Sequence, residues 1–272
     1  MKIAQYYDER GIRLGLIEDD QLIPLDFQGE MIHFIESSPK HKPIDKAKSI
    51  DTVTFAPPVS NPSKIVAIGL NYRDHIRESK GEIPKYPIIF AKFPSSLAGH
   101  HDMITWDSNL TRKVDFEAEL AVVIGKKIHK CHKTEAMDAI FGYACANDVS
   151  ARDLQFADGQ WVRGKSLDTF CPVGPWIVTP DEIPDPQSLD IRCWVNGQLM
   201  QDSNTGMMIF TLPELIAFIS ENFTLSPGDV ILTGTPHGVG AFREPSVYLK
   251  DGDEVIVEVE RIGRLVNICK TV

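Results

Sequence analysis

The stretch VDFEAELAVVIG, from Val114 to Gly125, decides how this chain is interpreted. Apolar and acidic residues alternate through its first half, a pattern that predicts a β-strand. Side chains two positions apart lie on the same face of a strand. One face therefore carries the carboxylates of Asp115, Glu117 and Glu119, and the same face continues with apolar residues. The acidic face is thus expected to lead into the interior of the protein.

Three adjacent carboxylates repel one another, most strongly where water is excluded. A buried carboxylate must be neutralised, paired with a cation or bound to a metal. Two interpretations are open at this point: a solvated, salt-bridged strand face or a metal site. A third acidic position favours the metal site, because Asp148 in CANDVSARDLQ follows another apolar stretch. Oxygen ligands alone select a hard cation, Mg²⁺ or Mn²⁺, and no His/Cys cluster with zinc spacing competes.

Strand-like runs dominate the chain outside this stretch. The patterns predict strands over 64–72, 87–93 and 228–232, with a glycine-rich loop after the last of them. Two hairpins are predicted, one around Asn196-Gly197 and one around Gly263. Helices are expected to be short, over 31–38, 73–79 and 211–223, with a further helical segment capped by Thr134. The fold class is therefore mostly β with short helices (α+β), arranged as a sandwich or roll.

The chain divides into two predicted domains. Residues 1–55 form a small β-rich N-terminal domain of short strands, and residues 63–272 form the larger domain. A Lys-rich and then Pro-rich segment from about residue 40 to 63 is expected to connect them.

Composition excludes several classes of function. The formal net charge of −10 argues against nucleic acid as a partner, because phosphates need a basic surface. No run approaches the roughly 18 apolar residues of a membrane span. The opening MKIAQYYDERG lacks the apolar centre of a signal peptide, so a cytoplasmic location is expected. Five scattered cysteines fit buried reduced thiols better than a disulfide or zinc framework.

Five motifs carry a family resemblance. GLNYRDHIRES, DFEAELAVVIGKK, GYACANDVSARDLQ, GKSLDTFCPVGPW and ILTGTPHGVG occur in this order. Together they resemble the fumarylacetoacetate hydrolase family, closest to its acylpyruvase and oxaloacetate decarboxylase branch. The resemblance covers about residue 63 to the end of the sequence. It implies a mixed β-roll that is usually a homodimer, and the N-terminal unit resembles the β-rich extension of some members.

The resemblance also implies a ligand set. The family's Glu-x-Glu pair and the first Asp of its Asp-Val/Met-Ser/Thr-Ala-Arg-Asp motif correspond here to Glu117, Glu119 and Asp148. A bound Mg²⁺ or Mn²⁺ would screen the repulsion between these carboxylates. Asp115 matches no family ligand position and is expected beside the ligands or in solvent.

A second group of residues is implied to act on water. His75 and Glu78 are three positions apart, so on a helix they share a face. A surface pair is the ordinary interpretation of this spacing. In the family, the matching pair lies on a mobile lid and activates water. The charged segment from 72 to 87 fits a lid that becomes ordered on binding.

The remaining candidates contact substrate. Lys165 is implied to face the substrate's keto oxygen and to stabilise an enolate, and Arg152 and Gln155 share a face if the chain turns helical after Asp148. Thr169 is a weaker candidate of the same kind. TGTPHGVG resembles an anion-cradling loop in which glycine N–H groups approach closely and Thr235 offers a hydroxyl.

The function implied is a divalent-metal-dependent hydrolase that cleaves a C–C bond in a small β-diketo acid such as an acylpyruvate. The leaving group is an enolate, and the partner is a small anionic 2-oxo acid. Decarboxylation of oxaloacetate and isomerisation of a 2-hydroxyhepta-2,4-diene-1,7-dioate use the same motifs and stay open. A non-catalytic protein that binds a 2-oxo acid is the alternative from a different class.

Overall fold

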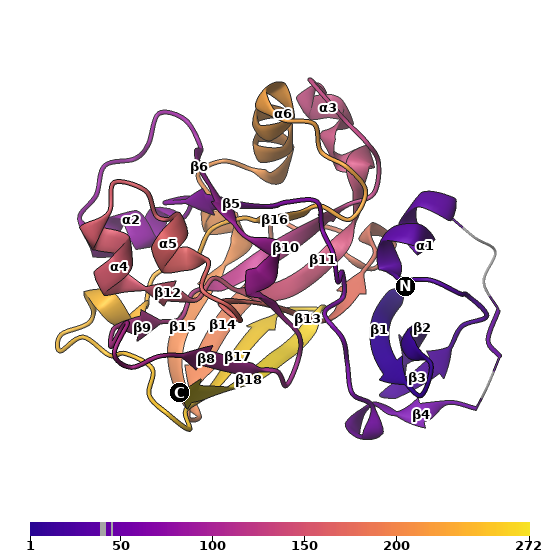
Figure 1. Ribbon diagram of the computed structural model, residues 1–272. Helices are drawn as coiled ribbons and strands as arrows, with labels where there is room; N and C mark the ends of the chain where they lie inside the picture. The colour runs from indigo at the N-terminus through magenta and orange to yellow at the C-terminus, as the bar shows by residue number, and fades with distance from the viewer. Residues whose placement is uncertain (39–41, 45) are drawn as a thin grey trace.

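A computed structural model describes residues 1–38, 42–44 and 46–272 of the chain. Two β-sheets make up most of the structure, and short helices lie around them (Figure 1). The predicted mostly β class with short helices is confirmed.

The larger sheet joins the N-terminal strands to the strands that carry the acidic stretch. Its order is β4-β3-β2-β1-β13-β11-β10-β16-β5-β6, with β7 beside β13. These strands are β1 (Lys2–Asp8), β2 (Gly11–Glu18), β3 (Gln21–Pro24), β4 (Lys48–Ser49), β5 (Ile65–Gly69), β6 (Ile88–Lys92), β7 (Leu97–Ala98), β10 (Ala118–Ile124), β11 (Ile140–Asn147), β13 (Cys171–Val178) and β16 (Val230–Leu232).

The smaller sheet has the order β15-β14-β17-β18-β8, and two further short strands pair only with each other. The five strands are β8 (Met103–Trp106), β14 (Asp190–Val195), β15 (Gln198–Asn204), β17 (Glu254–Val259) and β18 (Gly263–Thr271), and the separate pair is β9 (Val114–Asp115) with β12 (Ser150–Ala151). The α-helices are α1 (Met31–Ser37), α2 (Arg73–Ser79), α3 (Lys133–Ala136), α4 (Arg152–Ala157), α5 (Val162–Lys165) and α6 (Leu212–Asn222).

Both predicted hairpins are confirmed. β14 and β15 meet at Asn196-Gly197, where both residues have positive φ (50° and 75°), as a tight hairpin turn requires. β17 and β18 pair with Val259 opposite Gly263. The helix over 211–223 is also confirmed, since Thr211 and Glu214 form a reciprocal capping box at the start of α6. The residue before α3 is His132, so Thr134 lies inside that helix and does not cap it.

The N-terminal unit lies at one side of the molecule (Figure 1). Its strands continue the larger sheet, because β1 pairs with β13 at Lys2–Val178 and Ile3–Ile177. The two predicted domains, 1–55 and 63–272, therefore share one sheet, and the boundary between them stays a prediction. Residues 40, 41 and 45 of the expected connector lie outside the described residues.

The core lies between the two sheets. β11 packs on β17 and β18, and β10 packs on β14 and β17. β10 and β13 are buried along their whole length. All five cysteines are free thiols, and four of them are buried, as expected. The acidic residues Glu117, Glu119 and Asp148 lie where β10 begins and β11 ends, so the packed core fixes their backbone.

Candidate metal centre

The acidic stretch forms two strands with an interruption between them. β9 pairs Asp115 with Ser150, β10 begins at Ala118, and residues 116–117 belong to neither. The expectation of one continuous strand over 114–125 is wrong here. The facing strand, β11, ends at the same level, at Asn147. The N–H of the next residue, Asp148, donates to the carbonyl of Glu117 at 2.9 Å. The shared break lets Glu117 and Asp148 approach each other across the two strands.

The three predicted ligands lie together. Glu117, Glu119 and Asp148 each offer one carboxylate oxygen, and these oxygens all lie within 4.8 Å of one another. Their exposed fractions are 5%, 1% and 0%. A set of three buried oxygen donors fits a hard divalent cation such as Mg²⁺ or Mn²⁺. This burial excludes a face exposed to solvent, which was the ordinary interpretation of this stretch.

Buried cations surround the carboxylates. The ammonium of Lys165, at the end of α5, lies 2.8 Å from Glu117 Oε2 and 2.8 Å from Asp148 Oδ2. Lys92, at the end of β6, lies 2.5 Å from Asp148 Oδ1. Its exposed fraction is 1%. Lys92 is not among the residues predicted from the sequence, although β6 alternates so that Lys92 shares the buried face of Phe90.

These neighbours move the two glutamate pKa values in opposite directions. Burial alone would raise the pKa of Glu117, but Lys165 and Arg152 outweigh it and lower that pKa to about 2. The pKa of Glu119 is raised well above its ordinary value by burial and by the charges of Asp148 and Glu117. The carboxylates therefore avoid mutual repulsion in two ways, by pairing with cations and by retaining a proton.

We predict that metal binding releases a proton. A carboxyl side chain binds a metal in its deprotonated form. Mn²⁺ therefore has to displace the proton that the raised pKa of Glu119 favours in the metal-free protein. Affinity for Mn²⁺ should therefore rise with pH, and binding should release protons. Calorimetric titration in buffers of different ionisation enthalpy measures their number. A binding heat that is independent of the buffer would contradict the prediction.

The predicted lid pair lies on α2. His75 is buried, and its Nδ1 is 3.6 Å from Glu78 Oε2, so the helix places the two side chains on one face as expected. His75 Nδ1 has no hydrogen-bond partner among the described residues. Contacts to the rest of the protein hold α2 in place: Asp74 accepts from Ser203 Oγ at 2.5 Å and lies 3.0 Å from His237 Nδ1.

The predicted substrate-contacting residues differ in where they lie. On α4, Arg152 Nη1 is 2.9 Å from Gln155 Oε1, which confirms their shared face. Both line a cavity of about 90 Å³, together with Lys165 and Thr235. The hydroxyl of Thr169 accepts instead from the N–H of Thr105 on β8 at 2.8 Å, and Thr169 does not line this cavity.

The glycine-rich loop binds carboxylates of the protein itself. Gly234 N donates to Glu119, Gly238 N to Glu78 and Gly240 N to Asp115, each at 2.7 Å. The loop was expected to cradle an anion, and the groups that it contacts here are the carboxyl oxygens of three side chains of the site.

Aromatic rings close the small cavity. Phe90 and Trp161 meet edge to face, and the ring of Phe242 lies 5.7 Å from that of His75. All four rings line the cavity, which is about 90 Å³. A site of this size and composition suits a small anion whose charged groups face Lys165 and Arg152.

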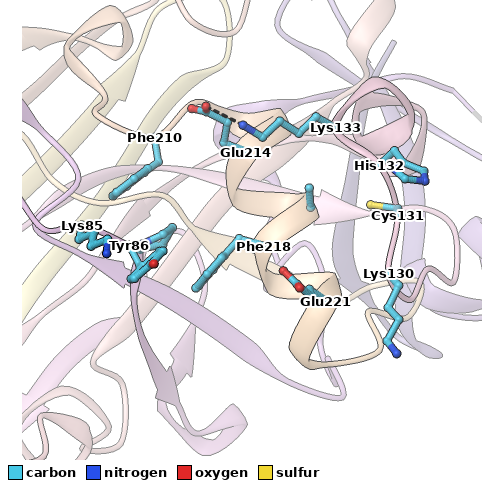
Figure 2. A pocket seen from close by; sticks show the side chains of 12 residues that line it. Lys85, Tyr86, Lys130, Cys131, His132, Lys133, Phe210, Glu214, Phe218 and Glu221 are labelled. Atoms are coloured by element: carbon cyan, nitrogen blue, oxygen red, sulfur yellow. Dashed lines mark hydrogen bonds and ion pairs between the residues drawn. The ribbon is translucent and has the colours of Figure 1, made fainter.

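A larger cavity lies elsewhere. It measures about 630 Å³ and surrounds α6, where Tyr86, Phe210 and Phe218 gather on one side and Lys133 pairs with Glu214 (Figure 2). None of the predicted catalytic, metal or substrate residues lines it. The candidate site is therefore assigned to the smaller cavity, where the buried charges converge.

Comparison with known proteins identifies relatives along most of the chain. The family model described as "Fumarylacetoacetate (FAA) hydrolase C-terminal" matches residues 64–270. A mitochondrial oxaloacetate tautomerase of Rattus norvegicus is 51% identical over 216 residues, which cover 79% of this chain and 69% of that protein. A mitochondrial oxaloacetate tautomerase of Homo sapiens is 50% identical over 217 residues, with the same coverage.

Solved structures match over the whole chain. A 2-hydroxyhepta-2,4-diene-1,7-dioate isomerase from Mycobacterium marinum is 34% identical, with a TM-score of 0.84 and coverage of 100% of this chain and 98% of that one. A maleylpyruvate hydrolase from Sphingobium, in complex with manganese(II) and pyruvate, is 31% identical, with a TM-score of 0.81 and coverage of 100% and 99%. Within the described residues, no helix is long and apolar enough to cross a membrane.

Proposed function

This chain belongs to the fumarylacetoacetate hydrolase family, and we propose that it is a divalent-metal-dependent enzyme that interconverts the keto and enol forms of a small 2-oxo dicarboxylic acid such as oxaloacetate. The observation that carries the proposal is the buried set of Glu117, Glu119 and Asp148, whose oxygens lie within 4.8 Å of one another beside Lys165. We also expect a cytoplasmic homodimer, although the tautomerases above carry mitochondrial names.

The three carboxylates would hold Mg²⁺ or Mn²⁺. Bound there, the cation supplies Lewis acidity that stabilises negative charge on a 2-oxo acid. Among the described residues, no other group of three His, Cys, Asp or Glu side chains offers ligand atoms this close together.

The side chains around the cavity can move one proton between carbon and oxygen. His75 is the base that removes a proton from the carbon beside the keto group, and Glu78, whose Oε2 lies 3.6 Å from His75 Nδ1, stabilises the imidazolium that forms. The pKa of Lys165 is raised, because Asp148 and Glu117 outweigh the effect of burial, so it stays an ammonium that faces the forming enolate oxygen. Transfer of this proton from His75 to that oxygen gives the enol and restores the neutral base, and the reverse sequence restores the ketone.

The size and charge of the cavity favour a four-carbon diacid. Arg152 and Gln155 lie on the wall, and Arg152 Nη2 is buried with no hydrogen-bond partner among the described residues. A guanidinium N–H in this state is a suitable donor to a second carboxylate. A cavity of about 90 Å³ leaves little room for a long acyl chain. The relatives named oxaloacetate tautomerases agree with this choice.

Hydrolysis of an acylpyruvate is the second candidate. It is favoured by the His75–Glu78 pair, since an imidazole oriented by a carboxylate can also activate water. Water would add to the distal carbonyl, the C–C bond would break, and the pyruvate enolate would leave and take up a proton. The maleylpyruvate hydrolase from Sphingobium holds manganese(II) and pyruvate together, which is consistent with such a product.

A substrate panel tests the choice. The protein with Mn²⁺ is incubated with oxaloacetate, acetylpyruvate, fumarylpyruvate and 2-hydroxyhepta-2,4-diene-1,7-dioate. We expect kcat/KM for oxaloacetate tautomerisation to exceed that for C–C cleavage of either acylpyruvate by at least about tenfold, since a poorly fitting chain costs that much in binding. Cleavage of an acylpyruvate as the fastest reaction would support the second candidate. No turnover of any compound would overturn both.

A further inference from the structure

Asp115 is the acidic residue of the opening stretch that is not part of the ligand group. It was expected beside the ligands or in solvent, and because it is fully buried only the position beside the ligands is possible. Oδ1 accepts from the N–H groups of Phe116 at 2.9 Å and Gly240 at 2.7 Å. Oδ2 accepts from the N–H of Ala241 at 2.9 Å and from Arg152 Nε at 2.8 Å. Every contact is with a donor, as suits a carboxylate.

Asp115 holds two parts of the site in place. The first is the guanidinium of Arg152. Nε is bound to Asp115, and Nη1 lies 2.6 Å from Glu117 Oε1 and 2.9 Å from Gln155 Oε1. Nη2 is the nitrogen that remains, and Arg152 lines the small cavity. A planar guanidinium fixed at Nε and Nη1 has no rotational freedom left, so Nη2 is fixed as well.

The second part that Asp115 holds in place is the turn over 240–242. Asp115 binds the N–H groups of Gly240 and Ala241, and the next residue, Phe242, contacts the ring of His75. The turn fits closely around the carboxylate, because a Cβ on Gly240 would lie 2.7 Å from Asp115 Oδ1 and 1.8 Å from the carbonyl oxygen of Val247. The carboxylate of Asp115 thus connects Arg152, which lines the cavity, to the 240–242 turn, which packs against His75.

We propose that Asp115 is a positioning residue that aligns Arg152 Nη2 with the second carboxylate of the substrate and fixes the turn that supports His75. The inference rests on the proposed function, because it requires a dicarboxylate in the cavity. It separates the acidic stretch into two roles: Glu117 and Glu119 would bind the metal, and Asp115 would set substrate selectivity through Arg152.

The variant Asp115→Asn tests this role. An amide replaces one carboxylate oxygen by an NH₂ group, which cannot accept, so either the Oδ2 contacts with Arg152 and Ala241 or the Oδ1 contacts with Phe116 and Gly240 are lost. For the Mn²⁺-loaded protein, affinity for oxaloacetate should fall about 10- to 100-fold, the usual cost of losing a buried supporting contact. Affinity for pyruvate, which lacks the second carboxylate, and affinity for Mn²⁺ should change by less than about threefold.

A double-mutant cycle shows whether Asp115 acts through Arg152. If it does, the variant with both Asp115→Asn and Arg152→Ala binds oxaloacetate no more weakly than Arg152→Ala alone. Equal losses for oxaloacetate and pyruvate, or additive losses in the cycle, would overturn the inference. Because these are binding measurements, they remain valid if the tautomerase activity itself is absent.

Asp229 provides a matched control. It is another fully buried aspartate, it pairs with Lys64 at 2.5 Å, and it lies outside the small cavity. Asp229→Asn should lower thermal stability without changing the preference for oxaloacetate over pyruvate. A similar change of preference in this control would show that Asp115→Asn acts only through stability.

Discussion

Replacing Glu119 by alanine is expected to weaken Mn²⁺ binding at least about 100-fold and to lower kcat/KM at least about 1,000-fold. Glu119 is one of three buried carboxylate ligands, and without it a cation would be held by two carboxylates that already pair with the ammonium groups of Lys92 and Lys165. Without the bound ion, the Lewis acidity on which the proposed enolisation depends is absent as well. Mn²⁺ affinity is measured by electron paramagnetic resonance of the free ion, and activity with oxaloacetate.

Glu119→Gln separates the loss of a ligand from the loss of packing. The amide keeps the volume of the side chain, and its oxygen can still accept from Gly234 N, which lies 2.7 Å from Glu119 Oε2. Saturating Mn²⁺ should raise the melting temperature of the wild-type protein, since a ligand that binds only the folded state stabilises it. The same Mn²⁺ should leave the melting temperature of Glu119→Gln nearly unchanged. Mn²⁺ affinity within about tenfold of wild type would contradict the assignment of the three carboxylates.

The sequence predicts which residues form this centre better than it predicts the backbone that brings them together. Alternation along one strand was enough to place Glu117 and Glu119 side by side. The break after Asp115 was not predictable, because it depends on the facing chain leaving its strand at Asp148, which is distant in the sequence. Local periodicity carries no information on which strand lies opposite.

The buried cations of the site were predicted only in part. Lys165 was identified by resemblance, but Lys92 was not, since a lysine at the end of a strand is usually exposed. Its position on the inward face of β6 was the available signal. That signal had meaning only once a buried carboxylate, here Asp148, was known to lie within reach. Long-range pairing of charges is thus the feature of the site that the sequence alone predicts least well.

The glycine-rich loop shows how one segment connects the parts of the site. Its N–H groups bind Glu119 of the ligand group, Glu78 of the lid and Asp115 beneath Arg152. These glycines leave no space for side chains, since a Cβ on Gly238 would lie 2.2 Å from the carbonyl oxygen of Met200. The proposed metal ligands, the predicted lid and the proposed substrate contact therefore all depend on the conformation of one loop.

Replacing His75 by alanine is expected to lower kcat for oxaloacetate tautomerisation by about 10²- to 10⁴-fold, the usual contribution of a positioned base. Mn²⁺ affinity should stay within about threefold, because His75 is not in the ligand group. The other lid contacts, from Asp74 to Ser203 and from Glu78 to Gly238, remain available to hold α2.

A lid that merely fails to close would give a different result from a lost base. The variant Asp74→Asn weakens the contacts with Ser203 and His237 but leaves His75 intact, so it should raise KM more than it lowers kcat. His132→Ala, a histidine at the α6 cavity, is the neutral control. If His75→Ala keeps more than about a tenth of wild-type kcat, another group removes the proton, and the assignment of the base is wrong. If instead His75→Ala and Asp74→Asn raise KM equally with kcat unchanged, His75 serves the lid and takes no part in the proton transfer.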